Sequence, residues 1–81
     1  MAKPSPSQAG NPALTALGTA IRERRAKLGI SQENLAFEAD LDRSYIGGIE
    51  RGEHNISLIN LCRIAQALDV SAGKLLGLAN L

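Results

Sequence analysis

The amino-acid sequence predicts a compact all-α domain of five short helices. Its 81 residues suffice for one small domain with a modest core. Leu, Ile and Ala dominate the apolar residues, whereas Phe37 and Tyr45 are the only aromatic residues, a composition that suits helices better than a β-sandwich. Apolar residues also recur at steps of three and four, the spacing of one helix face, and no segment has the pattern of a strand.

The folded domain is expected to span residues 13–81. Residues 1–12 contain all three prolines together with serine, glutamine and glycine, so we expect a disordered tail there. The first helix should cover residues 13–28, and Gly29 is placed to end it in a left-handed conformation. The predicted buried face of this helix holds Leu14, Leu17, Ile21 and Leu28.

The next two helices are expected to meet at a tight turn. Ser31 is a predicted N-cap, with Asn34 three residues later. The turn contains Asp40, and a left-handed conformation at that position is one that Asp tolerates. Asp42 is the predicted N-cap of the third helix, and Gly52 should end that helix in a left-handed conformation.

Two more helices complete the predicted fold. Ser57 should cap a fourth helix over residues 58–68, and Ser71 should cap a short fifth helix. The inner face of the fourth helix is predicted to hold Leu58, Leu61, Cys62, Ala65 and Leu68.

The third helix has one apolar and one polar side. Ile46 and Ile49 are three residues apart and should anchor it on the core, while the small Ala36 should let the second helix cross it closely. The outward side should then carry Arg43, Ser44, Tyr45 and Gly47. Arg can donate two parallel hydrogen bonds to guanine, Ser can donate or accept, and Tyr can pack on a thymine methyl group. Such a helix suits the major groove of DNA.

Polar residues on both sides of the third helix are candidates for phosphate contacts. Gln32 lies at the N-terminus of the second helix, where free backbone N–H groups favour a phosphate. Arg51, Asn55 and Ser57 follow the third helix. Capping and solvation are the plainer interpretation of Gln32 and Ser57, although Ser57 can both cap a helix and contact a phosphate.

Charge is informative through its placement. The net charge is only +1 at pH 7 and does not by itself indicate a nucleic-acid partner. Residues 22–27, however, contain four basic residues and a single acidic one, Glu23. The basic residues are Arg22, Arg24, Arg25 and Lys27. This run is either a local basic patch or a solvated helix face.

The sequence does not predict an enzyme, a cofactor or a metal site. The chain has one His and one Cys, and Cys62 lies on an apolar helix face, where a core position is expected. No metal-ligand spacing is present. A single Cys excludes an internal disulfide and fits a reducing compartment, and no apolar run approaches the roughly 18 residues that span a membrane. We expect a cytoplasmic protein without a membrane partner.

The segment from about Leu17 to Leu76 resembles the lambda-repressor/Cro-like (XRE) helix-turn-helix family. The shared features are Ser-Gln-Glu from Ser31, the small Ala36, the apolar Ile46 and Ile49, and the Leu-Asp-Val-Ser that ends at Ser71. Residues 41–58 are also similar to the controller proteins of bacterial restriction–modification systems, which typically show Arg-Thr/Ser-Tyr at the head of the recognition helix, then Gly-Ile-Glu-Arg. Three residues depart from these patterns. Asp40 replaces the usual glycine of the turn. Gly47 stands where a small polar residue is frequent, and His54 stands where the controller proteins commonly have Arg.

This resemblance implies a lambda-repressor-like domain that acts as a sequence-specific transcriptional regulator. Such a regulator would bind paired operator half-sites as a homodimer near its own promoter and time restriction-enzyme expression relative to the methyltransferase. The implied base-reading residues are Arg43, Ser44 and Tyr45, and those for phosphate contact or positioning are Gln32, Arg51, His54, Asn55 and Ser57. From the sequence alone, His54 is most simply a solvated loop residue. Activation would add RNA polymerase as a partner, with Glu33 or Glu38 as candidate contacts.

The C-terminal part has more apolar side chains than one small core can hide, so the fourth and fifth helices are predicted to form a two-fold dimer interface. The predicted interface residues are Ile56, Ile59, Ile64, Leu75, Leu76 and Leu78. Two other functions of the same fold stay open: a phage-type or chromosomal repressor, and an antitoxin-type regulator that binds DNA and a protein partner.

Overall fold

Helices account for most of residues 8–81, the part of the chain that the computed structural model describes. They are α1 (Pro12–Leu28), α2 (Gln32–Ala39), α3 (Arg43–Glu50), α4 (Leu58–Ala67) and α5 (Ala72–Leu78). Residues 8–81 contain no strand, so the predicted all-α fold of five helices is confirmed. Within the same range, no helix has the length and apolar character needed to cross a membrane.

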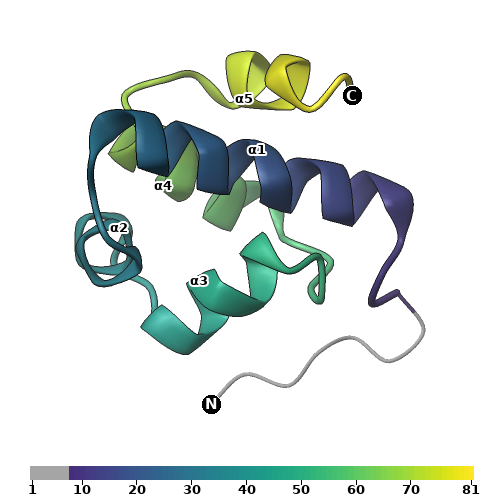
Figure 1. Ribbon diagram of the computed structural model, residues 1–81, viewed down its shortest axis with the longest axis horizontal. Helices are drawn as coiled ribbons and strands as arrows, with labels where there is room; N and C mark the ends of the chain where they lie inside the picture. The colour runs from purple at the N-terminus through teal and green to yellow at the C-terminus, as the bar shows by residue number, and fades with distance from the viewer. Residues whose placement is uncertain (1–7) are drawn as a thin grey trace.

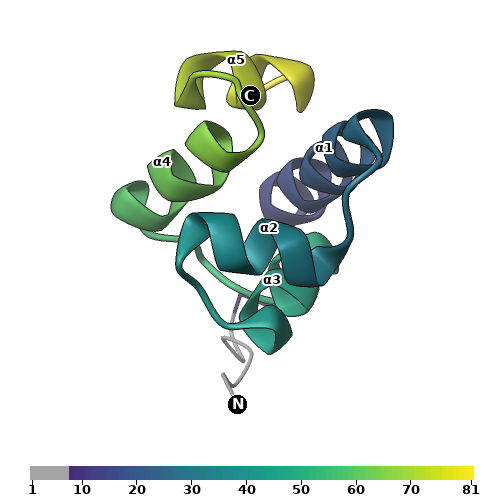
Figure 2. The same ribbon diagram turned by 90° about the vertical axis from the view of Figure 1, so that its left-hand side faces the viewer.

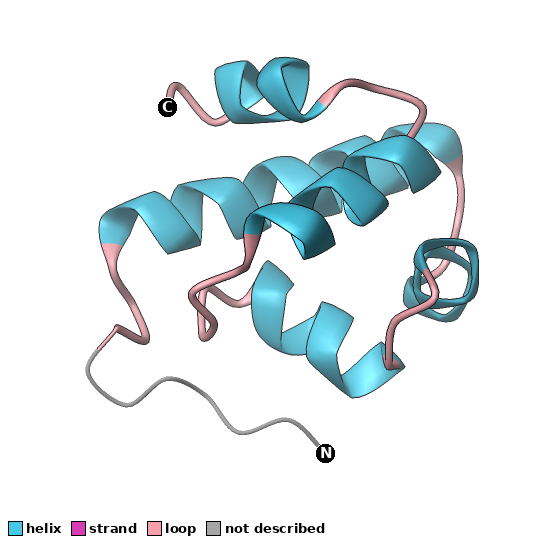
Figure 3. Ribbon diagram, turned by 180° about the vertical axis from the view of Figure 1, so that it is seen from behind, coloured by secondary structure: helices cyan, strands magenta, loops and turns pink. Residues whose placement is uncertain are grey.

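The long helix α1 lies at the centre of the molecule (Figure 1). It packs against α5 on one side and α3 on the other, and α2 packs against α3 and α4. The view from behind shows how α4 leads up to α5, which it also contacts (Figure 3). This arrangement leaves α3 at the edge of the domain, opposite α5.

Side-chain caps fix most of the predicted helix starts. Ser31, Ser57 and Ser71 each accept a hydrogen bond from the backbone N–H three residues later, at 3.0, 3.2 and 2.9 Å. Asp42 occupies the N-cap position of α3, but its side chain makes no capping hydrogen bond. The predicted left-handed residues are confirmed at Gly29, Asp40 and Gly52, with φ of 71°, 57° and 76°.

Helix α1 begins one residue before the predicted boundary at residue 13. Asn11 caps α1 by accepting a hydrogen bond from the backbone N–H of Ala13, and Pro12 is the first helical residue, where its missing N–H costs nothing. The backbone N–H of Gly10 donates to the backbone O of Gly52 at 3.0 Å. Asn11 and Pro12 therefore form the start of α1, whereas the sequence placed them in the tail; residues 1–7 lie outside the described part.

One core joins all five helices. Its largest fully buried side chains are Ile21, Leu35, Ile46, Ile64, Leu68 and Leu75. Three residues predicted to be buried are exposed instead: Leu28, Leu58 and Cys62. Leu28 is the last residue of α1, and Leu58 precedes the first buried residue of α4 by almost one turn. Cys62 follows the buried Leu61 by one residue, which turns it about 100° away from the core.

The structure also corrects the predicted dimer interface. Ile64 and Leu75 are fully buried within the subunit, so the prediction that they contact a second subunit is wrong. The reason is helical spacing, since Ile64 shares the buried face of α4 with Leu61 and Ala65. The other four predicted residues keep accessible surface: Ile56 and Leu76 are half-buried, and Ile59 and Leu78 are exposed.

Candidate nucleic-acid interface

The N-terminal end of α3 carries polar side chains at the surface of the molecule. Arg43 is exposed, and Ser44 is half-buried beside it. Ile46 and Ile49 are buried on the opposite side of α3, as the sequence predicted. Helix α2 lies across α3 (Figure 2), and Arg43 Nη1 donates a hydrogen bond to Oε1 of Gln32, the first residue of α2, at 3.3 Å. The turn therefore brings two of the predicted contact residues together.

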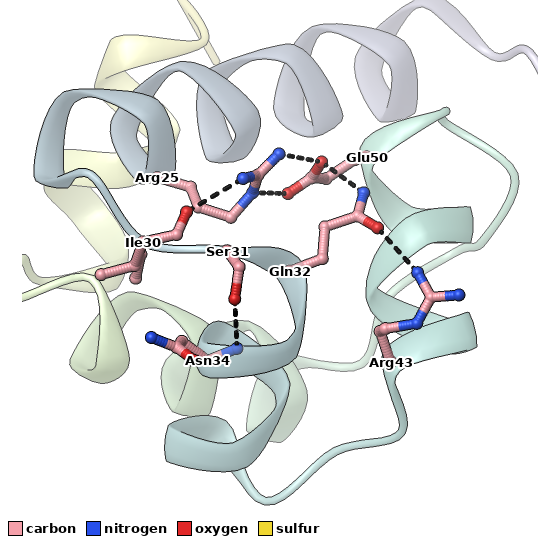
Figure 4. A network of polar contacts seen from close by, with 7 residues as sticks. All are labelled: Arg25, Ile30, Ser31, Gln32, Asn34, Arg43 and Glu50. Atoms are coloured by element: carbon pink, nitrogen blue, oxygen red, sulfur yellow. Dashed lines mark hydrogen bonds and ion pairs between the residues drawn. The ribbon is translucent and has the colours of Figure 1, made fainter.

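A polar network at the N-terminal end of α2 links Gln32 to a buried ion pair between α1 and α3 (Figure 4). Arg25 Nε donates to Glu50 Oε2 at 2.8 Å, and Arg25 Nη2 donates to Glu50 Oε1 at 3.2 Å. Arg25 Nη1 donates to the backbone O of Ile30 at 3.0 Å, and Gln32 Nε2 donates to Glu50 Oε1 at 2.9 Å. The hydrogen bonds to Glu50 raise the pKa of Arg25 by more than burial lowers it, so this guanidinium stays charged.

The sequence prediction missed this pair, although the sequence contains a signal for it. Glu50 follows Ile46 by four residues, which places it on the buried side of α3. A carboxylate in such a position requires a cation or several hydrogen-bond donors. Arg25 supplies both. Its neighbour Arg24 donates to the backbone O of Leu68 at 3.0 Å, so the basic run of α1 is neither one patch nor one solvated face.

Two adjacent glycines make room for side chains on both sides of α3. Gly47 is buried, so the prediction that it faces outward is wrong. A Cβ on Gly47 would lie 3.1 Å from Arg51 Nη1 and 3.7 Å from Gln32 Oε1. A Cβ on Gly48 would lie 2.6 Å from His54 Nε2. Gly47 is thus covered by Gln32 and Arg51, and Gly48 provides the space that His54 fills.

His54 packs into the domain. It is 7% exposed, so its interpretation as a solvated loop residue is wrong. Its ring centroid lies 5.0 Å from that of Tyr45, with the two rings tilted by 58°. Tyr45 is half-buried rather than fully outward, and its hydroxyl accepts a hydrogen bond from Asn60 Nδ2 at 3.1 Å. Two neighbours, His54 in the loop and Asn60 on α4, therefore fix the position of the Tyr45 side chain.

The other residues predicted to contact phosphates stay at the surface. Arg51, Asn55 and Ser57 are exposed, and Ser57 makes its predicted capping bond to α4. Arg51 Nε donates to Glu53 Oε2 at 2.7 Å, and this hydrogen bond lowers the pKa of Glu53 below its ordinary value. A phosphate approaching Arg51 would have to compete with Glu53 for the guanidinium.

Comparison with known proteins agrees with this arrangement. The helix-turn-helix family model matches residues 21–75. Control protein C.BamHI of Bacillus amyloliquefaciens is 50% identical over 60 residues, which cover 73% of this chain and 74% of that protein. The crystal structure of the restriction–modification controller protein C.AhdI from Aeromonas hydrophila superposes with a TM-score of 0.75 at 50% identity, covering 76% of this chain and 94% of the other. The wild-type controller protein C.Esp1396I gives a TM-score of 0.77 at 34% identity, covering 84% and 88%. The chain therefore belongs to the helix-turn-helix family and, within it, to the restriction–modification controller proteins, which makes it a DNA-binding regulator of transcription and not an enzyme.

Proposed function

We propose that this protein reads paired DNA half-sites near its own promoter by inserting the N-terminal end of α3 into the major groove. The observation that carries the proposal is the exposed guanidinium of Arg43. Arg43 is the first residue of α3, and the opposite side of this helix packs on the core through Ile46 and Ile49. An arginine in that position can reach the O6 and N7 atoms of guanine. Ser44 lies beside it with accessible surface, and the hydroxyl end of Tyr45 is fixed by Asn60.

Phosphate contacts would set the register of α3 in the groove. The Gln32 amide lies over Gly47 beside Arg51, and the exposed Asn55 and Ser57 lie in the segment between α3 and α4. Contacts of this kind orient a protein on the duplex without carrying sequence information. His54 would act by positioning Tyr45, since its own side chain is buried. The protein would act in the cytoplasm, with exposed Glu33 and Glu38 of α2 free to contact RNA polymerase.

Replacement of Arg43 by alanine should weaken binding to the protein's own upstream DNA by about tenfold, the value of one good base contact. Binding to unrelated DNA should change far less. A mobility-shift titration on both DNAs measures this preference. Arg63→Ala is the matched control, because Arg63 is also exposed but lies on α4. An Arg43→Ala protein that keeps the affinity and preference of the Arg63→Ala protein would disprove the base-reading role.

A homodimer would place two copies of α3 on successive major grooves. Such a pair matches half-sites whose centres lie about 34 Å apart, one turn of DNA. The surface proposed for the two-fold contact consists of the four predicted interface residues that remain accessible: Ile56, Ile59, Leu76 and Leu78. Ile59 is the most open of these four, at 67% exposed. Burial of this apolar surface against a second copy would stabilise the pair.

Replacement of Ile59 by glutamate should convert the dimer into a monomer, because two carboxylates would face each other across the two-fold contact. Sedimentation velocity at tens of micromolar protein measures the mass. Phe37→Glu is the control, since Phe37 is also an exposed apolar residue but lies on α2. A wild-type monomer, or an Ile59→Glu protein that remains dimeric, would contradict the proposed interface.

A further inference from the structure

We propose that Glu50 is a positioning residue for DNA reading, which fixes the orientation of the Gln32 amide and, through it, the guanidinium of Arg43. This inference rests on the base-reading role of Arg43 proposed above. Neither Glu50 nor Arg25 is exposed enough to reach a base edge. Any effect of Glu50 on the preference for a DNA sequence must therefore pass through Gln32.

The first step is the hydrogen bond between Glu50 and Gln32. The side chain of Glu50 is only 2% exposed and is held by two hydrogen bonds from Arg25. A carboxylate paired in this way can only accept hydrogen bonds. The Gln32 amide must therefore turn its nitrogen, and not its oxygen, toward Glu50, as the 2.9 Å distance from Gln32 Nε2 to Glu50 Oε1 records.

The second step follows from the geometry of an amide. With Nε2 turned inward, Oε1 points outward, where it accepts a hydrogen bond from Arg43 Nη1 at 3.3 Å. The reversed amide would bring its NH₂ group against a guanidinium, and two donors cannot form a hydrogen bond. Only one of the two amide orientations therefore offers Arg43 an acceptor, and Glu50 selects that orientation.

The third feature is the surface on which the amide lies. A Cβ on Gly47 would be 3.7 Å from Gln32 Oε1 and 3.9 Å from Gln32 Nε2, so the amide lies directly over the backbone of α3. Hydrogen bonds link four side chains in series, and these side chains come from α1, α2 and α3 (Figure 4): Arg25, Glu50, Gln32 and Arg43. They connect the interior of the domain to the one arginine at the head of α3.

The consequence for DNA binding is preorganisation. A free arginine side chain samples many rotamers, and holding it near one geometry before binding lowers the entropy lost when it contacts a base. Nonspecific binding, which depends on phosphate contacts, gains little from this restraint. Loss of the restraint should therefore lower sequence preference more than it lowers overall affinity.

The amide orientation can be tested without DNA, by NMR of the Gln32 side-chain NH₂ group. Its signals are assigned by their loss in Gln32→Ala, and those of the exposed Gln66 by their loss in Gln66→Ala. We expect one Gln32 NH₂ proton to lie downfield of the Gln66 protons and to move toward them in Glu50→Gln. The backbone spectrum of Glu50→Gln checks that the variant is folded. The proposed orientation is overturned if the Gln32 NH₂ signals coincide with those of Gln66 in the wild type. It is also overturned if their chemical shifts stay unchanged in a folded Glu50→Gln variant.

The effect on DNA reading is tested by a double-mutant cycle on the protein's own upstream DNA and on unrelated DNA. Gln32→Ala should lower the preference between them by about fivefold when Arg43 is present, and by less than twofold in the Arg43→Ala background. Equal losses in both backgrounds would overturn the link from Gln32 to Arg43 while leaving the base-reading role intact. Failure of that role would instead appear in Arg43→Ala alone, as an unchanged preference, and would overturn both.

Discussion

Replacement of Arg25 by leucine should lower the free energy of unfolding by about 3 kcal/mol, because it leaves the carboxylate of Glu50 buried without its cation. Loss of one partner from a buried pair is far costlier than loss of a surface pair, which contributes about 1 kcal/mol or less. The Arg25 side chain is 17% exposed and that of Glu50 is 2% exposed, so the cost falls at the lower end of the range for buried pairs. The variant also loses the hydrogen bond from Arg25 to the backbone O of Ile30.

Urea unfolding followed by circular dichroism measures this loss. Arg22→Leu is the matched control, since Arg22 is an exposed arginine on the same helix, and its stability should change by less than about 0.5 kcal/mol. The double variant Arg25→Leu/Glu50→Leu should recover much of the loss, because it no longer buries an unpaired charge. A protein with Arg25→Leu that unfolds at the same urea concentration as Arg22→Leu would show that the pair does not hold α1 to α3.

Replacement of Gly18 by alanine should lower the free energy of unfolding by about 2 kcal/mol. A Cβ at Gly18 would meet the backbone oxygens of Ile49 and Glu50, 2.6 Å from the latter, where helices α1 and α3 approach each other. Backbone atoms cannot swing aside as a flexible side chain can, so overpacking at this contact costs about 3 kcal/mol. Alanine recovers about 1 kcal/mol through its higher helix propensity, and the clash outweighs that gain.

Thermal unfolding measures this loss. For a domain of this size, Gly18→Ala should lower the Tm by about 10 °C. Gly73→Ala is the control, since Gly73 is also helical and a Cβ there would meet only Ser71 Oγ, at 4.0 Å. Its Tm should stay level or rise slightly. Equal Tm values for the two variants would mean that α1 and α3 are not in backbone contact at this point.

Local chemistry made much of the fold predictable. Ser31, Ser57 and Ser71 are N-caps because a serine hydroxyl can accept from a backbone N–H three residues ahead, whatever the rest of the chain does. Asp40 and Gly52 take left-handed conformations because few other residue types do so readily. The apolar spacing of Ile46 and Ile49 similarly fixed the buried side of α3, and hence the exposure of Arg43.

Predictions failed where the outcome depends on a partner distant in sequence. Helical spacing alone could not show that His54 would fill the space above Gly48 or that Gly47 would lie beneath Gln32. Ile64 and Leu75 were assigned to the dimer interface because a count of apolar residues does not say which of them one subunit can bury.

By itself, the sequence determined the five helices, the three serine N-caps and the polar head of α3, since each depends on residues within a turn or two of one another. Only the tertiary structure decided how that head is held. The pair of Arg25 with Glu50, 25 residues apart, and the contact of Gln32 with Arg43 exist because α1, α2 and α3 cross at one place. The buried carboxylate of Glu50 can only accept hydrogen bonds, so the Gln32 amide turns its nitrogen toward it.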